Sequence, residues 1–492
     1  MKDQHVVIIG GGLAGLSAGC YALASGFRAT ILEHNIAPGG VCTAWQRGPY
    51  LVDGCIHWLT GGPFDRVYAE LGVLQALSLR PMSHFMALRD ASDGAELSLI
   101  ADLDRLAREM IALAPEDRDE IGRIIDGARR FAEHAPPFDK PRDLYTLRDG
   151  LRMLWEMRHD LDTMVHFRSR LDEYADRHLK SPKLRGLLTS FFPVETPALF
   201  LLMTLGYLSR GWLSRPVGGT AAFRDAIVHS FTSLGGDLQL HTTVDEVLVD
   251  HGRARGVRLQ DGSIVEGDAV VCTASAPETI FRLLGGRYEA DATARRMREW
   301  RLFAPIVFAS YGVATPLEGQ PQLLHIHNVE PFTVGDTCNN SLSLRICNDD
   351  PCFAPAGHTV VQAMLMTSYD WWAKRGAGYN AAKEEIGARA LEVIDRHLPG
   401  VAERVRMTDI STPLTYWNMA RSWRGAFEGW MPRDGSMFET ISQRIKGLSN
   451  FYMAGQWVEP GGGVPTACSS GRSAAQLLCA DRGIPFVPPY PQ

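Results

Sequence analysis

The amino-acid sequence predicts an α/β fold in which one parallel sheet is assembled from separated parts of the chain. Residues 6–33 have the pattern of a strand, a glycine-rich turn, a helix and a second strand. Residues 450–479 repeat the order of strand, glycine-rich loop and helix. Between these stretches, short strands divided by turn residues fill 238–272. Strands that alternate with helices in this way indicate a parallel sheet covered by helices.

The first stretch carries the glycine pattern of a dinucleotide-binding turn. An apolar, β-branched strand, Val6–Ile9, runs into Gly10, Gly12 and Gly15, which take the spacing G-x-G-x-x-G. In this pattern the glycines permit a tight turn, close approach of a pyrophosphate and close packing of helix on strand. We therefore expect a side chain at any of the three to collide with its surroundings.

A helix is predicted directly after the turn, over residues 13–25. The first N–H groups of a helix have no partner within it, so those around Leu13 and Ala14 would face the phosphates. Glu33 ends the next predicted strand, 28–32, where a carboxylate can accept hydrogen bonds from ribose hydroxyls and disfavours a 2′-phosphate. This Rossmann-like unit is therefore expected to bind FAD or NAD rather than NADP.

Composition narrows the class of protein. The chain has 492 residues, of which 45% are hydrophobic and 22% charged, as in ordinary globular proteins. Its net charge of −6, without a block of like charges, gives no support for a nucleic-acid partner. Its nine cysteines lack a C-x-x-C pair, which favours reduced thiols. Without a signal-peptide pattern or a long apolar run, we expect a cytoplasmic protein, either soluble or bound at a membrane surface.

A second glycine turn follows the dinucleotide motif. Gly39, Gly40 and Val41 precede a short strand that ends in Asp53, Gly54 and a polar-aromatic tip containing His57 and Trp58. This combination resembles the opening of the flavin-dependent superfamily of carotenoid desaturases, carotenoid isomerases and retinol saturases, and more loosely that of the amine oxidases. The resemblance implies that the glycines contact a second part of FAD and that the tip lies near the flavin ring.

Two later segments extend the resemblance. The run from Arg215 to Cys272, with a helix over 223–231 and short strands, is similar to the second piece of the flavin domain, where the backbone at Val244 would approach the adenine. The strand 450–454, the loop and the helix 466–479 are similar to the final flavin motif, in which the helix N-terminus lies under the flavin. The implied contact residues of this loop are Gly455, Gln456, Gly462, Gly463, Val464 and Pro465. Because no second nicotinamide-type motif is present, FAD is expected to be the sole cofactor.

These segments define the expected domains. A discontinuous Rossmann-like FAD-binding domain is expected to combine residues 1–85, 215–285 and 440–492. An α+β substrate domain is expected to combine a helical insertion, 86–214, with a mixed sheet in 286–439. Strands are predicted there over 305–311, 323–327, 342–347 and 359–367, and a helix over 381–397.

An apolar stretch near the end of the helical insertion allows three interpretations. Residues 187–212 are strongly apolar, but Pro193 and Pro197 interrupt them, and the uninterrupted part, 198–208, is too short to span a bilayer. The stretch could be a buried helix, a wall of an apolar substrate tunnel or a patch that dips into a lipid interface.

Four residues are candidates for acid–base chemistry. Glu459 lies in the last glycine loop, Glu428 in a segment that resembles the one before that loop, and Glu195 is the only charge between Leu187 and Leu208. A carboxyl group among apolar side chains has a raised pKa, which suits proton transfer. Glu459 could instead be a solvated loop carboxylate, Glu195 a helix-capping or paired carboxylate, and the fourth candidate, His57, a structural histidine. Covalent attachment of the flavin through His57 or Cys42 is an alternative.

Two histidines form the pattern in the sequence that is most similar to a metal-binding motif. His325 and His327 lie two residues apart, hence on one face of a strand, but no third ligand is evident. We therefore expect no metal.

The sequence thus leads to one main hypothesis and two alternatives. The main one is an FAD-dependent oxidoreductase that acts on C–C bonds of a long apolar substrate, a polyene or isoprenoid-like molecule, by desaturation, saturation or isomerisation. The first alternative is a flavin amine or amino-acid oxidase. The second, which is not an enzyme, is an escort-type prenyl-binding protein on the same scaffold.

Overall fold

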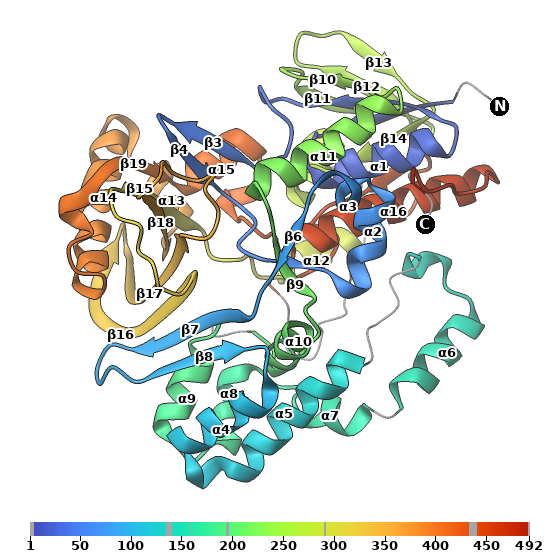
Figure 1. The fold of residues 1–492 in the computed structure, drawn as a ribbon. Coiled ribbons are helices and arrows are strands. Elements are labelled where there is room, and N and C mark those ends of the chain that lie inside the picture. Colours follow the sequence, from blue (N-terminus) through green and yellow to red (C-terminus); the bar gives the residue numbers. More distant parts are fainter. Residues whose placement is uncertain are drawn as a thin grey trace.

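Two sheets organise the chain in the computed structural model, which describes residues 4–133, 140–158, 160–192, 196–289, 292–431 and 440–490. One is a five-stranded parallel sheet and the other a seven-stranded mixed sheet (Figure 1). A helical region lies beside the second sheet. The predicted fold class, an α/β fold with a Rossmann-like parallel sheet and a mixed substrate sheet, is confirmed.

The parallel sheet draws its strands from three distant parts of the sequence. Its order is β10-β2-β1-β14-β20, and every neighbouring pair is parallel. The strands are β1 (His5–Ile9), β2 (Arg28–Leu32), β10 (Asp237–Gln239), β14 (Ala269–Cys272) and β20 (Phe451–Met453). The near-continuous burial of β1, β2, β14 and β20 follows from coverage on both faces, whereas no residue of the edge strand β10 is buried.

Three helices cover one face of this sheet: α1 (Leu13–Ala24), α11 (Gly219–Ser233) and α16 (Gly463–Arg482). Glycines allow them to pack closely. A Cβ atom at Gly471 of α16 would lie 2.3 Å from the Ala14 carbonyl oxygen of α1. The Ser17 hydroxyl donates a hydrogen bond of 2.7 Å to the Cys468 carbonyl across the same contact. The first and last helices of the chain are therefore held directly against each other.

The opposite face is covered by a small antiparallel sheet and loops. Its strands are β11 (Val244–Asp250), β12 (Arg253–Leu259) and β13 (Ile264–Glu266), joined by the predicted Asp261-Gly262 turn. Helix α12 (Ala292–Glu299) follows. Two predicted helices begin earlier than expected, α11 at Gly219 and α16 at Gly463, because the first helical turn tolerates glycine and proline.

The mixed sheet has the order β19-β15-β18-β17-β16-β7-β8. Helix α14 (Tyr379–His397) packs on one face of it, so the other face is left for a cavity. The pairing is antiparallel except between β16 and β7. The strands are β7 (His84–Asp90), β8 (Glu96–Ile100), β15 (Ile306–Val313), β16 (Leu323–Val334), β17 (Thr337–Cys347), β18 (Thr359–Met366) and β19 (Val405–Ser411).

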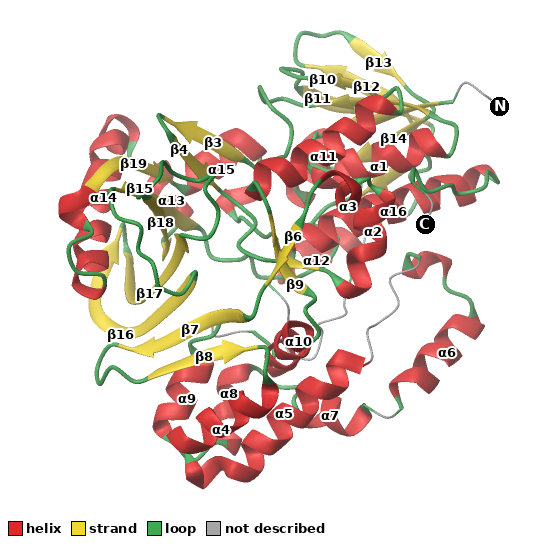
Figure 2. Cartoon of the chain, in the orientation of Figure 1, coloured by secondary structure: helices red, strands yellow, loops and turns green. Residues whose placement is uncertain are grey.

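The helical insertion begins later than predicted. Residues 84–100, assigned in part to the insertion 86–214, form the hairpin β7–β8 at the edge of the mixed sheet. The hairpin lies against the helices in Figure 2. Residues 84–90 pair as a strand with both β8 and β16, and the helical period starts only after Asp102, whose side chain caps α4.

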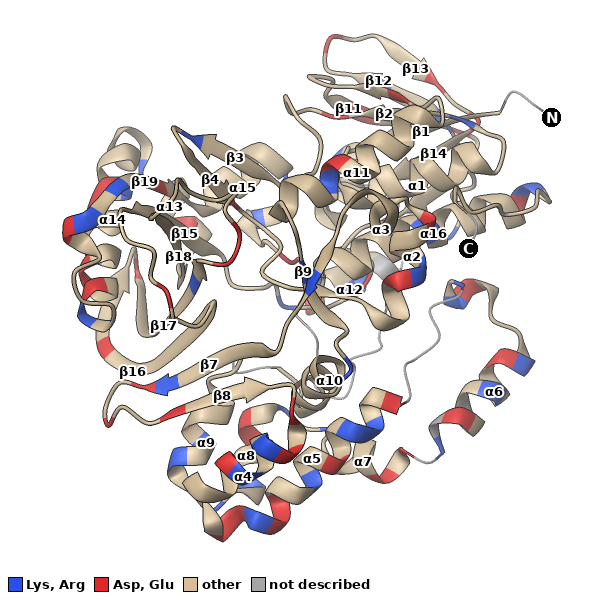
Figure 3. Ribbon diagram, viewed as in Figure 1, with Lys and Arg blue, Asp and Glu red and all other residues tan. Residues whose placement is uncertain are grey.

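Seven helices of the described residues follow this hairpin: α4 (Leu103–Leu113), α5 (Arg118–Glu133), α6 (Leu147–Met157), α7 (Leu161–His166), α8 (Leu171–His178), α9 (Pro182–Thr189) and α10 (Ala198–Ser209). Charged side chains are spread over α4 to α9 and over α14, whereas α1 and α10 carry none (Figure 3).

Helix α10 is the apolar stretch noted in the sequence, and it is mostly buried. In the described parts of 187–212 no large apolar side chain is exposed, so the lipid-patch interpretation is wrong for this stretch. The exposed apolar side chains of the region lie instead on α6 and α7: Leu147, Leu151, Trp155, Leu161 and Val165. Among the described helices, none has the length and hydropathy needed to cross a bilayer.

Shorter elements connect these parts. They are β3 (Ala44–Arg47), β4 (Tyr50–Asp53), β5 (Leu59–Thr60), β6 (Leu79–Pro81), β9 (Leu213–Pro216), α2 (Asp65–Glu70), α3 (Val73–Ala76), α13 (Tyr369–Ala373) and α15 (Pro413–Ala420). All nine cysteines are free thiols.

Candidate active site

A cavity of about 2170 Å³ extends from the glycine turns of both chain ends to the exposed face of the mixed sheet and to the helices. Of the residues predicted to contact FAD, it is lined by Gly10, Gly12, Leu13, Ala14, Glu33, Gly39, Gly40, Val41, His57, Trp58, Val244, Gly455, Gln456, Gly462, Gly463, Val464 and Pro465. Gly15 does not line it. The candidate residues from the two ends of the chain therefore share one space.

The structural reason for a glycine differs at each of the three positions of the first turn. A Cβ atom at Gly10, where φ is +98°, would lie 2.6 Å from the Thr273 hydroxyl, and one at Gly15 would lie 2.0 Å from the Gly10 carbonyl oxygen. A Cβ at Gly12 would meet no protein atom closer than 3.9 Å. The expected collision is thus confirmed for Gly10 and Gly15, whereas at Gly12, where the expected neighbour is a pyrophosphate, it stays a prediction. Gly15 fits α1 against β1, and Gly12 borders open cavity.

Glu33 is fixed at the carboxyl end of β2. Its carboxylate accepts hydrogen bonds from the backbone N–H of Gly11 at 2.6 Å and of Asn35 at 2.8 Å. It also lies 3.0 Å from His34 Nδ1, and this contact raises the pKa of His34. An ionised carboxylate has about four lone-pair sites, so Glu33 can accept further donors from the cavity.

The second glycine turn is joined to the first. Gly39 and Gly40 have φ values of +123° and +60°, and Gly39 donates its N–H to the Gly11 carbonyl at 2.8 Å. Sequence reasoning missed a third segment here, Thr273, Ala274 and Ser275, which follows β14 and also lines the cavity. Its position directly after a buried parallel strand was the available signal, because ligands bind at the carboxyl ends of such strands.

The N-terminus of α16 reaches the same space. Gly462 has a φ of +54°, and a Cβ atom there would lie 2.4 Å from the Glu428 carbonyl oxygen. Gly455 lies close to Ala14, since a Cβ on it would be 3.7 Å from the Ala14 methyl group. The glycine loop that leads into α16 therefore lies beside the first turn of α1.

The donor and acceptor set at this end fits a dinucleotide. The hydroxyl oxygens of Ser275 and Ser469 are buried without hydrogen-bond partners, although both residues line the cavity. Buried polar atoms without partners are costly unless a ligand or water satisfies them. Together with two helix N-termini, the clearance at Gly12 and the carboxylate of Glu33, they provide what phosphates and ribose need.

Two of the predicted acid–base residues lie beside the last glycine loop. Glu428 and Glu459 both line the cavity, and burial raises the pKa of each carboxyl to about 7; Arg142 partly offsets this rise for Glu459. Their loops are tied together, because the Gln456 amide donates to the Phe427 carbonyl at 3.1 Å. Each carboxyl can therefore hold a proton near neutral pH. Glu195 lies outside the described residues.

His57 and Trp58 stand between the glycine turns and the mixed sheet. The His57 ring stacks on Phe308 at 6.1 Å, and burial, aided by the nearby Arg345 guanidinium, lowers the pKa of His57 to about 3. His57 is therefore neutral at pH 7 and is not a strong proton donor. Below it, Asp53 and Arg345 form a buried ion pair of 3.1 Å that links β4 to β17.

The remaining wall is largely apolar and aromatic. Trp58 packs edge-on against Phe85 and Phe192, with ring centroids 5.0 and 5.9 Å apart. Helix α10 contributes further side chains, which confirms that it is a buried helix that also forms part of the cavity wall. The aromatic and apolar lining residues of this region are Trp58, Phe191, Phe192, Phe200, Met203 and Tyr207.

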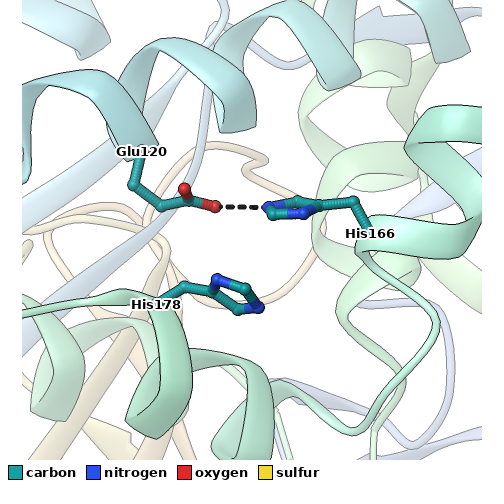
Figure 4. Close-up of side chains that lie close together, drawn as sticks. All are labelled: Glu120, His166 and His178. Carbon is teal, nitrogen blue, oxygen red and sulfur yellow. Dashed lines mark hydrogen bonds and ion pairs between the residues drawn. The ribbon is translucent and has the colours of Figure 1, made fainter.

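One cluster of possible metal ligands lies in the helical region. Glu120, His166 and His178 place ligand atoms within 4.8 Å of one another, from α5, α7 and α8 (Figure 4). The Glu120 carboxylate already accepts hydrogen bonds from His166 at 2.7 Å, Tyr174 at 2.5 Å and Arg123 at 2.9 Å. The cluster is therefore a hydrogen-bonded tie between three helices.

Comparison with known proteins agrees with this arrangement. The family model described as "Flavin containing amine oxidoreductase" matches residues 13–479. The chain is 27% identical to a phytoene desaturase (neurosporene-forming) of Rhodobacter capsulatus, over 96% of this chain and 94% of that protein. It is 26% identical to a phytoene desaturase (lycopene-forming) of Pseudescherichia vulneris, over 97% and 99%. It is 22% identical to the chloroplastic prolycopene isomerase of Arabidopsis thaliana, over 97% and 83%.

Solved structures show the same fold. A wild-type putrescine oxidase bound to putrescine has a TM-score of 0.61 at 15% identity, over 97% of this chain and 99% of that one. Cyclohexylamine oxidase from Brevibacterium oxydans IH-35A has a TM-score of 0.61 at 14% identity, over 98% and 100%. At these identities the likeness concerns the fold alone.

Proposed function

The chain belongs to the family of flavin-containing amine oxidoreductases, and we propose that it acts on C–C bonds of a long apolar, polyene or isoprenoid-like substrate. It is an FAD-dependent oxidoreductase of the phytoene desaturase-like kind. The proposed reaction is desaturation, saturation or isomerisation. We also propose that residues 1–85, 215–285 and 440–492 form the FAD-binding domain and that the rest of the chain forms the substrate domain.

The observation that carries the proposal is the continuity of the cavity. At one end lie the glycine turns and the N-termini of α1 and α16, and at the other the aromatic and apolar wall that includes Trp58, Phe192 and Phe200. A volume of about 2170 Å³ exceeds what a single drug-sized ligand needs. A flavin dinucleotide and a long apolar chain can therefore lie side by side, with the chain removed from water.

In this proposal the residues predicted from the sequence hold the cofactor. The clearance at Gly12 would take the pyrophosphate, Glu33 would hold the adenosine ribose, and Gly39, Gly40 and the N-terminus of α16 would hold the flavin part. When bound, FAD accepts or returns a hydride equivalent.

The protein's own groups manage protons and water. Glu428 and Glu459, whose carboxyls have a pKa of about 7, can each hold a proton beside the α16 N-terminus and release it to a base or accept it from a carbon centre. His57 stays neutral and orients ligands by hydrogen bonding and by stacking on Phe308. The aromatic wall excludes water, which protects a reactive carbon chain.

Product analysis tests the proposal. The purified holoenzyme, with its flavin either oxidised or reduced by dithionite, is incubated without oxygen with an equimolar amount of detergent-solubilised phytoene or lycopene, and the extracted polyenes are examined by mass spectrometry and absorbance. A change in the number or geometry of double bonds is expected. Hydrogen peroxide release with putrescine or cyclohexylamine in air, together with no change in either polyene, would support an amine oxidase instead.

A further inference from the structure

The cavity face of the mixed sheet changes from apolar to polar in a regular order. Directly paired residues of neighbouring strands share a face, so register identifies the cavity row. Phe308 on β15 pairs with Met364 on β18, which pairs with Ser343 on β17, which pairs with His325 on β16. The row therefore begins with apolar side chains and ends with polar ones.

A second row repeats the same order. Ile306 on β15 pairs with Met366 on β18, while Ser341 on β17 pairs with His327 on β16, which pairs with Asp90 on β7. All five side chains line the cavity. Both rows thus place their polar residues on strands far from His57, which stacks on Phe308.

The separation of the two ends follows from strand spacing. Neighbouring strands lie about 4.8 Å apart, so three steps from β15 to β16 give about 14 Å between Phe308 and the histidine pair. A substrate extended across the sheet, with its reacting carbons near Phe308, reaches the histidines with a part of the molecule about 14 Å away.

The polar end contains hydrogen-bonding capacity that the described protein does not use. His327 Nε2 is buried without a hydrogen-bond partner and lies 3.5 Å from the Asp90 carboxylate. His325 Nδ1 lies 2.7 Å from the Ser343 hydroxyl, and no described residue bonds its other ring nitrogen. Such groups are costly beside a pure hydrocarbon, because each buried unsatisfied group costs about 1–3 kcal/mol.

We propose that His325, His327 and Asp90 form a subsite for a neutral hydroxyl group carried by the apolar substrate. This inference rests on the proposed function, because it names the substrate class of the same cavity. The hydroxyl group accepts a hydrogen bond from a histidine ring N–H and donates a hydrogen bond to the Asp90 carboxylate. It thereby satisfies the unpartnered ring nitrogen of His327, while Asp90, which already accepts hydrogen bonds from Ser92 and Asn328, accepts one more.

The local charges favour a neutral hydroxyl over an acid. The Asp90 carboxylate repels a carboxylate or phosphate. The side-chain amide of Asn328 donates to both carboxylate oxygens of Asp90 at 3.2 Å, and this amide carries no positive charge. Burial, followed by the nearby His327, lowers the pKa of His325 to about 4, so that His325 is uncharged at pH 7. His325 therefore offers hydrogen bonds without a positive charge.

Binding of two matched probes to the holoenzyme tests the subsite. Octadecan-1-ol and octadecane, each added from detergent micelles, are titrated at pH 7 while protein and flavin fluorescence are followed. The alcohol is expected to bind about tenfold more tightly, the ratio that one additional buried hydrogen bond of about 1.4 kcal/mol provides. Equal dissociation constants for the two probes would overturn the proposal.

Variants test which residues produce the preference for the alcohol. The double change His325→Leu and His327→Leu is expected to abolish the preference for the alcohol, while His327→Gln, which keeps a donor and an acceptor, retains part of it. His84→Leu, at an exposed position of the same sheet outside the cavity lining, serves as the matched control and keeps the full preference. A preference that survives in the double variant would contradict the assignment.

The readout separates this inference from the proposed function. Neither probe needs to react, so a failure to convert polyenes would count against the proposed function alone. Loss of flavin from the double variant is monitored by its absorbance, and in that case His327→Gln decides the result. If His327→Gln prefers the alcohol as strongly as the wild type and the His84→Leu control do, the cavity has only a general affinity for alcohols and the subsite is refuted.

Discussion

Removing the charge of Glu428 should stabilise the protein at alkaline pH but not at acid pH. The pKa of this carboxyl rises from 4.5 to about 7 through burial, so the folded protein binds its proton more tightly than the unfolded chain does. Below pH 4.5 the group is protonated in both states and costs nothing. As the pH rises through 4.5 toward 7, the unfolded chain loses the proton first, and stability falls.

The size of the effect follows from the shift. A difference of about 2.5 pKa units corresponds to about 3.4 kcal/mol, and partial access to water in the cavity reduces this to about 1–2 kcal/mol. Glu428→Gln should therefore raise the free energy of unfolding of the flavin-free protein by about 1–2 kcal/mol at pH 8, with little change at pH 4.5.

Urea denaturation at the two pH values measures this difference. Glu318→Gln, at an exposed site, is the control and should behave like the wild type at both. If Glu428→Gln shows the same stability difference from wild type at pH 8 and at pH 4.5, the carboxyl is not held in a proton-binding environment, and its proposed role in proton transfer is lost.

Three further predictions concern the glycine turn and two buried carboxylates. Gly12→Val should fold but bind flavin about 5- to 150-fold more weakly, because overpacking against the pyrophosphate costs about 1–3 kcal/mol, whereas Gly15→Val should fail to fold. Flavin absorbance and melting temperature distinguish the two variants, and a flavin-replete Gly12→Val would refute the turn's role. Asp53→Asn should lower the free energy of unfolding by about 3–5 kcal/mol because it leaves Arg345 buried and unpaired, measured by urea titration; a change below about 1 kcal/mol would contradict this. Glu120→Ala should lower it by about 2–3 kcal/mol through lost charged hydrogen bonds; an unchanged melting temperature would show that the helices are held by packing alone.

The parallel sheet and its glycine turns were predictable because their signals are local. β1, β2 and β14 are short apolar runs bounded by glycine or polar residues, and such runs have few alternatives to a buried strand. His325 and His327 were expected on one face of a strand, and both line the cavity.

The structural features that could not be predicted from the sequence depend on contacts between residues far apart in the chain. Asp53 was noticed only as part of a motif, because its partner Arg345 lies on another sheet. The hairpin β7–β8 was assigned to the helical insertion because its pairing with β16 decides its structure, and no local signal reveals that edge. The polar end of the cavity likewise emerges only from the register of five strands.

The most direct test of the account is rapid anaerobic mixing of the holoenzyme with a polyene while the flavin absorbance is recorded. The account predicts a change in the flavin spectrum with phytoene or lycopene, because chain and flavin share one cavity, and none with putrescine. Bleaching by putrescine alone, with a spectrum that polyenes leave untouched, would contradict it.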